Sequence, residues 1–171
     1  APSIYADGPI VGNGMYSISD RRIKTNLSST NSGEDLNTLN QINITNYEYK
    51  DKIENGNGKY KKVIAQEVEK VYPIAVTQHR DIVPDIYKLA ESTTFNPKTQ
   101  TLKVLLAGHG LKEGEKARLI FGKDKQTFTI QKVGDTWCTV AHTQPEDKGF
   151  VYGREVDDFR TVDYEAISML N

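Results

Sequence analysis

The sequence has little cysteine, no excess of charge of either sign and no long apolar run. One cysteine, Cys138, stands among 171 residues, which excludes an internal disulfide framework and any Cys-based zinc site. Lysine and arginine number 22 against 23 aspartates and glutamates, a net charge of −1, so no basic excess favours nucleic acid or an anionic membrane. No apolar run approaches the roughly 18 residues of a membrane span. We therefore expect neither nucleic acid nor a membrane as a partner.

Motifs for metal or phosphate binding are also missing. The three histidines form no HxxxH or HExxH pair, and the glycine-rich stretch 108–116 lacks the spacing of a phosphate-binding loop. An acidic group is interleaved with Arg154 and Arg160 and predicts a self-neutralising polar surface; its members are Glu155, Asp157, Asp158 and Asp163. The aromatic residues are spread along the chain and indicate no stacking platform. No cofactor and no metal are expected.

Residues 1–18 alternate between turn-forming and strand-forming residues. The turn formers are Pro2, Gly8, Pro9, Gly12 and Gly14; between them stand Ile4, Tyr5, Ile10, Val11 and Tyr16. Such short extended pieces cannot bury a core alone and need another body to lie on. We expect this segment to be part of something longer.

The next part of the chain predicts short helices and one hairpin. Residues 33–43 carry two acidic residues and then an apolar stripe, which indicates a helix. Residues 44–50 alternate like a strand, residues 54–59 contain Asn-Gly twice, and residues 59–65 supply a returning strand. Residues 66–73 predict a two-turn helix that stops at a proline.

From Thr93 onward the sequence becomes rich in strand-forming residues. Five runs with turn signals between them predict a compact antiparallel sheet or small barrel; they are 100–108, 115–122, 126–134, 136–143 and 149–156. Cys138 lies in one of these runs and is expected to be a buried apolar residue, not a reactive thiol. Asp163 is a plausible N-cap of a last short helix that needs a partner surface.

One stretch, "SDRRIK" from Ser19 to Lys24, carries candidate chemistry. A charged run of this kind is most often a solvated linker. A lysine can nevertheless activate a serine if its amine is neutral. With an ordinary pKa of about 10.4, about 0.04% of a lysine is neutral at pH 7, a cost of about 4.6 kcal/mol that burial or neighbouring cations reduce. A spacing of five is not a same-face helical spacing, so Lys24 has to be brought to Ser19 by a turn or by another subunit.

Three blocks of the sequence resemble one known family. "SDRRIKTN" is similar to the start of the C-terminal intramolecular chaperone domains of bacteriophage tailspikes and tail fibres, the endosialidase-type self-cleaving family. "VIAQEVEKVYPIAV" (63–76) resembles its second block, and "FVYGREVDDFRTVDYEAISMLN" (150–171) resembles its third, in the same order. The animal myelin regulatory factor carries a relative of these domains.

The resemblance implies an α+β fold and a trimeric assembly. Short helices and a hairpin would form the chaperone core, joined by a β-rich antiparallel insert at about 93–149 and an extended N-terminal stalk strand. Residues 1–19 would be the end of the tailspike or fibre β-stalk, and residues 20–171 the chaperone domain. The partners would be two further copies and the upstream stalk. The domain would act in the host cytoplasm during virion assembly and be released, while its parent protein stays in the virion tail.

The same resemblance implies a self-cleaving serine endopeptidase that turns over once, with Ser19 as nucleophile and Lys24 as base. It favours cleavage of the bond between Ser19 and Asp20. Geometry favours the bond between Ile18 and Ser19, because Ser19 Oγ reaches the preceding carbonyl through a five-membered ring. Cleavage after Ser19 would need activated water or a serine from a neighbouring chain.

Two other interpretations remain open. One is a structural cap or receptor-binding tip of a viral fibre that does not cleave itself. The other is the processing domain of a membrane-bound transcription factor, which the stalk-like arm and the phage-like third block disfavour.

Overall fold

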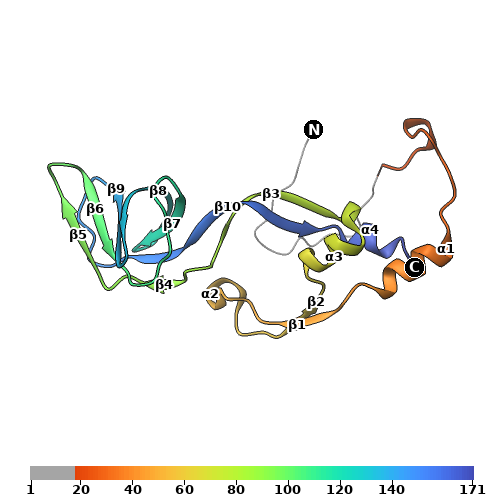
Figure 1. Cartoon of the computed structure of the whole chain (residues 1–171), viewed down its shortest axis with the longest axis horizontal. Coiled ribbons are helices and arrows are strands. Elements are labelled where there is room, and N and C mark those ends of the chain that lie inside the picture. Colours follow the sequence, from red (N-terminus) through yellow and green to blue (C-terminus); the bar gives the residue numbers. More distant parts are fainter. Residues whose placement is uncertain (1–17) are drawn as a thin grey trace. The chain divides into compact units, whose positions relative to one another are not determined.

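The computed structural model describes residues 18–171, in two compact units. Of the first unit the structure describes residues 18–31, and the second unit is Ser32–Asn171 (Figure 1). The expectations for residues 1–17, including most of the stalk strand, lie outside the described residues. Within its described part, the first unit contains the 3-10 turn η1, Arg21–Ile23.

The helices of the second unit are short. They are α1 (Ser32–Asn40), α2 (Lys52–Asn55), α3 (Ala65–Val71), the 3-10 turn η2 (Pro73–Ala75) and α4 (Tyr164–Ser168). Two of them confirm the expected signals directly. α3 ends before Pro73, and α4 is capped by Asp163, whose Oδ1 accepts a hydrogen bond from the N–H of Ala166 at 3.0 Å.

The expected hairpin is present, with a longer connection than a two-residue turn. β1 (Thr45–Tyr47) pairs antiparallel with β2 (Tyr60–Lys62). Between them the chain forms α2, because Asp51 caps it by accepting hydrogen bonds from two N–H groups. Gly56, at φ +73°, then ends this helical turn. The first Asn-Gly pair, Asn55-Gly56, therefore ends α2, and the second, Asn57-Gly58, lies in the loop after it.

The other eight strands form one antiparallel sheet in the order β3-β10-β7-β8-β9-β6-β5, with β4 paired to β10. Their bounds are β3 (Val76–Val83), β4 (Lys88–Leu89), β5 (Ser92–Asn96), β6 (Thr101–Leu105), β7 (Lys116–Phe121), β8 (Asp124–Gly134), β9 (Trp137–Ala141) and β10 (Phe150–Val162). The five β-rich runs of the sequence correspond to β6 to β10. Together with the short helices, this sheet agrees with the expected α+β class.

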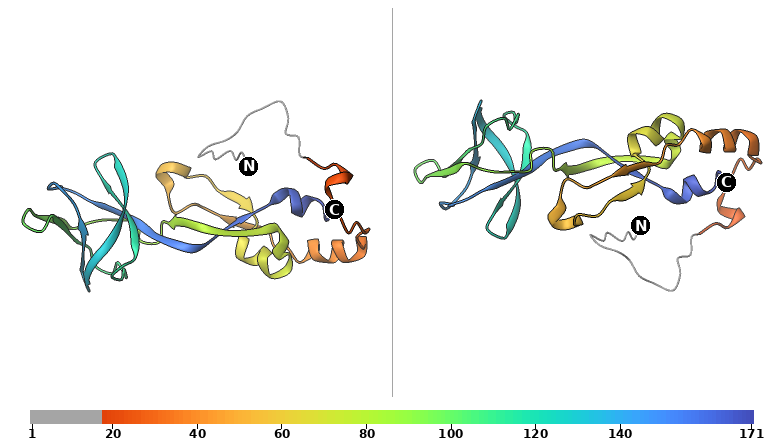
Figure 2. Two further views of the ribbon diagram at one scale, coloured as in Figure 1. Left: turned by 90° about the horizontal axis from the view of Figure 1, so that it is seen from above. Right: turned by 90° about the horizontal axis from the view of Figure 1, so that it is seen from below.

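The sequence did not predict β3 or the second half of β10. These segments pair with each other as a two-stranded ribbon that continues beyond the rest of the sheet, where α3 packs against it (Figures 1 and 2). Much of β3 is exposed, and the ribbon carries charged and polar side chains on both faces. The alternation that identifies a half-buried strand is therefore missing there.

The apolar core of the second unit is formed by residues of the eight-stranded sheet and of the loops between its strands. Twelve buried residues form one cluster; they are Ala90, Leu102, Val104, Leu106, Leu111, Ala117, Leu119, Phe121, Ile130, Cys138, Val140 and Val151. Cys138 has no exposed surface, and its burial raises the pKa of the thiol to about 11. It is the buried apolar residue that the sequence predicted. α3 contributes a smaller buried contact through Val68.

Gly153 sits where β10 changes its register against β7, and no other residue fits there. A Cβ on Gly153 would lie 1.8 Å from the carbonyl oxygen of Val83 on the adjacent strand. We expect Gly153→Ala to lower the free energy of unfolding by about 1–3 kcal/mol, since backbone atoms have to move apart. The measurement is the urea midpoint of the purified chain.

Gly58→Ala is the matched control, because its Cβ would meet only the tip of the Tyr60 side chain, at 3.3 Å. Equal midpoints for the two variants would contradict the steric argument.

Candidate functional site

A short turn reverses the chain immediately after Ser19. Asp20 caps η1, and its Oδ1 accepts a hydrogen bond from the N–H of Arg22 at 2.8 Å. The carbonyl oxygens of Asp20 and Arg21 then accept hydrogen bonds from the N–H groups of Ile23 and Lys24, at 3.3 and 3.2 Å. An aspartate at the N-cap is the residue type that favours such a turn.

This turn brings together the two candidate catalytic side chains. Lys24 Nζ donates a hydrogen bond to Ser19 Oγ at 2.6 Å. Of the two routes that the sequence left open, the structure takes the turn within one chain. Ser19, Asp20 and Lys24 are thus neighbours in space, and their roles in catalysis stay a prediction.

Asp20 is occupied by its own turn. The Arg22 guanidinium donates three hydrogen bonds to its carboxylate: Nε to Oδ1 at 3.0 Å and to Oδ2 at 3.3 Å, and a terminal nitrogen to Oδ2 at 2.7 Å. These side-chain bonds, and then the bond from the Arg22 N–H, hold the pKa of Asp20 below its ordinary value. Both side chains are exposed, so the pair contributes little stability. Asp20 therefore shapes the turn as a charged acceptor that Arg22 already engages.

The environment of Ser19 and Lys24 is solvent. All residues from Ile18 to Asn31 are exposed. The Lys24 amine donates to the hydroxyl here, whereas a lysine that acts as a base must be neutral and accept the hydroxyl proton. Burial is one means of favouring a neutral amine. The segment supplies the required proximity, and burial has to come from another source.

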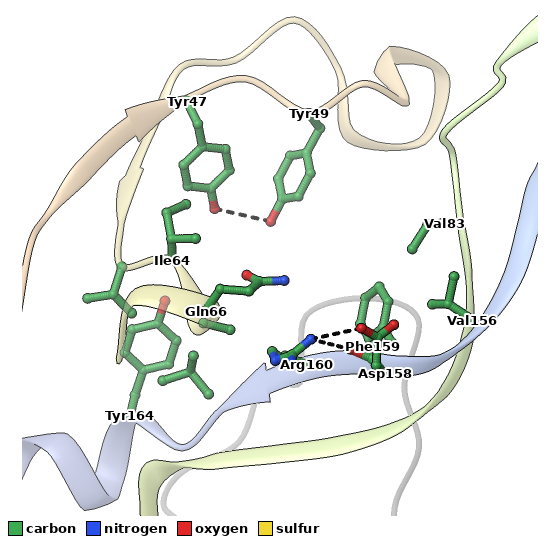
Figure 3. A pocket seen from close by; sticks show the side chains of 13 residues that line it. Tyr47, Tyr49, Ile64, Gln66, Val83, Val156, Asp158, Phe159, Arg160 and Tyr164 are labelled. Carbon is green, nitrogen blue, oxygen red and sulfur yellow. Dashed lines mark hydrogen bonds and ion pairs between the residues drawn. The ribbon is translucent and has the colours of Figure 1, made fainter. Parts of the chain in front are cut away.

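A groove of about 440 Å³ lies in the second unit, between the hairpin and the β3–β10 ribbon (Figure 3). Tyr47 and Tyr49 form one wall, and Val83, Val156 and Phe159 lie across from them. The remaining lining residues are Val63, Ile64, Ala65, Gln66, Asp158, Arg160, Val162 and Tyr164. The groove is thus mostly apolar and aromatic.

Three tyrosines lie together at this wall, whereas the sequence indicated that the aromatic residues are spread along the chain with no stacking platform. The ring centroids of Tyr47 and Tyr60 are 5.8 Å apart, and those of Tyr49 and Tyr60 are 4.9 Å apart. Strand alternation over 44–50, which puts Tyr47 and Tyr49 on one face, was the available signal. Tyr60 joins them only through the antiparallel register, which directly opposes Tyr47 and Tyr60.

Three of the four acidic residues form ion pairs, although only Asp158 does so with one of the two interleaved arginines; Asp163 caps α4 instead, and Arg154 pairs with Asp85. Arg80 Nε lies 2.6 Å from Asp157, and Lys116 Nζ lies 3.5 Å from Glu155. Arg160 reaches Asp158 at 3.2 Å and Glu69 on α3 at 2.5 Å. Within residues 18–171, no three histidine, cysteine or acidic side chains gather into a group that could hold a metal ion.

The histidines have separate local roles. His109 is buried in the 108–116 turn: its Nδ1 accepts from the N–H of Leu111 at 2.9 Å, so its Nε2 donates to the carbonyl of Gly134 at 3.0 Å. His142 pairs with Glu146 at 2.9 Å, and the His79 ring packs on Phe159.

In the part of the chain that the structure describes, none of the helices has the length and apolarity needed to cross a membrane.

Comparison with known proteins identifies one segment. Residues 19–77, about a third of the chain, match the family model described as chaperone of endosialidase. The matched segment begins at Ser19 and contains Lys24, the hairpin, α3 and η2. No curated protein matches the chain. The resemblance inferred from the sequence is confirmed over this segment.

The contact between the Tyr47 and Tyr49 hydroxyls leads to a prediction about the titration of Tyr47. A hydrogen bond with Tyr49, at 3.3 Å between the two hydroxyl oxygens, is the main cause that raises the pKa of Tyr47 to about 12. A raised pKa means that this contribution to stability is complete below about pH 10 and is lost as the pH rises through about 12. We expect Tyr49→Phe to move the titration of Tyr47, followed by NMR of its labelled ring, to lower pH.

Tyr72→Phe is the control, since Tyr72 is not among the groove residues. An unchanged Tyr47 titration in Tyr49→Phe would show that the hydroxyl pair is not the cause.

Proposed function

Because residues 19–77 belong to the family of the chaperone of endosialidase, we propose that the chain is a self-releasing intramolecular chaperone domain. It assists the folding and trimerisation of a bacteriophage tailspike or tail fibre in the host cytoplasm, and then cuts its own chain at Ser19. The released domain leaves the mature stalk in the virion tail. The observation that carries the proposal is the hydrogen bond of 2.6 Å between Lys24 Nζ and Ser19 Oγ at the first residues of the matched segment.

The chemistry follows from these two side chains. A neutral Lys24 amine takes the proton of the Ser19 hydroxyl, and the oxygen then attacks a carbonyl carbon. Attack on the Ile18 carbonyl forms an ester and breaks the bond between Ile18 and Ser19, and the Lys24 ammonium passes its proton to the leaving Ser19 nitrogen; water then hydrolyses the ester. Cleavage between Ser19 and Asp20, which the family resemblance favours, requires water or a second serine as the attacking group. No cofactor or metal takes part in either route.

Exposed apolar side chains in the matched segment support an assembly of several copies. Ile18 and Ile23 are 88% and 66% exposed on either side of the serine. Other large apolar residues exposed in or beside this segment are Leu27, Leu36, Ile44, Ile53 and Ile74. Apolar side chains that are left in water gain free energy when a partner buries them. Packing of three copies would bury this surface and shelter the Lys24 amine, so that cleavage waits for a correctly assembled stalk.

Cleavage has a further consequence for the parent protein. Loss of the covalent link between chaperone and stalk removes the route by which the stalk reached its fold. Unfolding is then followed by slow or failed refolding, and the product is kinetically stable.

Removal of either member of the pair should stop release. We expect Ser19→Ala and Lys24→Ala each to abolish cleavage while leaving the fold intact, and Lys24→Arg to fail as well because a guanidinium does not give up its proton. Intact-mass measurement after expression with upstream stalk sequence is the test. Loss of the mass up to Ser19, or only up to Ile18, distinguishes the two bonds.

Normal cleavage by Ser19→Ala would eliminate the nucleophile assignment. An uncleaved wild-type assembly that remains trimeric would favour the alternative, a structural cap or receptor-binding tip of a viral fibre.

Assembly and cleavage should be coupled. We expect Ser19→Ala with upstream stalk sequence to have three times the chain mass by light scattering. Wild-type cleavage should slow on dilution and in Ile167→Asp, which places a charge on the apolar side of α4. A monomer that cleaves at full rate at every concentration would contradict this coupling and leave the serine–lysine pair itself intact.

A further inference from the structure

A buried carboxylate joins the hairpin to the sheet in the second unit. Asp51 is only 4% exposed, and it stands at the start of α2. Its Oδ1 accepts hydrogen bonds from the N–H groups of Ile53 and Glu54 and from the Tyr87 hydroxyl, each at 3.0 Å. The first two bonds cap α2, whereas the third crosses to a different part of the fold.

The tyrosines come from the sheet. Tyr87 lies between β3 and β4, and its N–H donates to the carbonyl oxygen of Tyr152 on β10 at 2.9 Å. The Tyr152 side chain lines the same cavity as Asp51 and Tyr87, and it is near enough to lower the pKa of Asp51. The backbone of Tyr87 has φ +46°, a conformation that costs about 1 kcal/mol or more and persists only where the surroundings enforce it. Three segments that are distant in sequence therefore converge on one carboxylate.

Helix capping alone does not account for this arrangement. Asp163 caps α4 by a similar bond at 3.0 Å, but its side chain is exposed, and within residues 18–171 no tyrosine hydroxyl donates a hydrogen bond to it. A carboxylate is buried at a cost unless several hydrogen bonds compensate it. Asp51 has two such bonds from its own helix and a third from the Tyr87 hydroxyl, and the Tyr152 phenol lies in the same cavity.

We propose that the side chains of Asp51, Tyr87 and Tyr152 form a cluster, here called the Asp51 clasp, that holds the β1–α2–β2 hairpin against the sheet. The clasp opens when the carboxylate loses its charge. Asp51 lies in the family-matched segment, and both tyrosines lie outside it. The clasp is thus the link through which the β-rich remainder positions the chaperone hairpin. It does not depend on the proposed cleavage.

The clasp also controls the aromatic groove. Tyr49 precedes Asp51 by two residues, and with Tyr47 it forms the hairpin wall of the groove (Figure 3). The opposite wall belongs to β3 and β10. Release of the hairpin therefore moves one wall away from the other and exposes the tyrosine rings.

The ionisation of Asp51 and Tyr152 sets the pH range in which the clasp stays closed. Burial opposes the charge of Asp51, but hydrogen bonds from Glu54, Tyr87 and Ile53, together with the nearby Tyr152 phenol, outweigh it and hold the pKa below the ordinary value of 3.8. Its contribution is therefore complete above about pH 4 and is lost as the pH falls through the folded-state pKa. Burial, followed by Asp51, raises the pKa of Tyr152, so the phenol contribution is lost only above about pH 10.

The other charged groups that face the clasp pair among themselves. Lys125 on β8 forms an ion pair with Glu54 on α2, and the Arg118 guanidinium on β7 lies over the Tyr152 ring at 5.7 Å. Lys52 pairs with Glu48 at 2.7 Å, one turn before. Among the carboxylates around the clasp, Asp51 is the buried one.

Hydrogen exchange of the full chain, read by mass spectrometry, tests the clasp. We expect Asp51→Ala to speed exchange of the 45–62 peptide on the order of tenfold to a hundredfold, the effect of losing hydrogen bonds to a buried charge, while peptides from β6 to β9 are unchanged. Asp163→Ala is the matched control: it also removes a helix cap, but it should leave the 45–62 peptide protected.

Two conservative variants keep the test decisive if Asp51→Ala fails to fold. Tyr87→Phe and Tyr152→Phe each remove one hydroxyl, and each should speed exchange of the same peptide with little change elsewhere. In the wild type this exchange should rise further, relative to the intrinsic rate, below about pH 4, and in Asp51→Asn that acid response should be absent. Unchanged hairpin protection in all these variants, or equal opening of hairpin and sheet, would overturn the proposal.

Discussion

The antiparallel pairing of β10 is the constraint on which the second unit depends. This strand of 13 residues pairs with β7 and β4 at its start and with β3 along the rest of its length. Its first half carries buried Val151 into the core, and its second half forms the ribbon that α3 packs against. A two-stranded ribbon is marginal on its own. Its continuity with the sheet is what gives α3 and the groove a fixed surface.

The β-rich strands and the limits of α3 and α4 could be predicted from the sequence, because there a local pattern coincides with burial or with a stop or start signal. The β-rich runs alternate because one face of each strand meets the core, and Pro73 and Asp163 are local stop and start signals. The ribbon could not be predicted, because its strands are stabilised by pairing and not by a buried face. The hairpin connection differed because Asp51 caps a helical turn there, and its carboxylate is buried by a hydrogen bond from Tyr87, 36 positions later in the chain. No window of local sequence contains both partners.

At the candidate site, the local geometry could be predicted from the sequence, but burial of the side chains could not. Every contact that brings Lys24 to Ser19 lies within six residues, so the sequence contained the whole turn: an N-cap aspartate, an arginine that clamps it and a spacing that excludes a regular helix. What the local sequence does not supply is shelter from water. The serine and lysine are close in an exposed segment, and proximity and burial are thus separate requirements of the proposed chemistry. The first is met by five consecutive peptide bonds, and the second needs a surface larger than the turn.

The position of the cut decides what happens to the pair. If the bond between Ser19 and Asp20 breaks, the hydroxyl leaves with the stalk while Lys24 stays on the chaperone, together with the bonds between Asp20 and Arg22 that shape the turn. The contact of 2.6 Å is then divided between two molecules, so the domain cannot act again. If the bond between Ile18 and Ser19 breaks, both side chains remain on the chaperone and Ser19 becomes its first residue. Its new amino group would then carry charge beside the Lys24 amine at neutral pH, and like charges at that distance repel. Either of the two proposed cuts would alter the contact between Ser19 and Lys24, so the proposed cleavage would occur once in each chain.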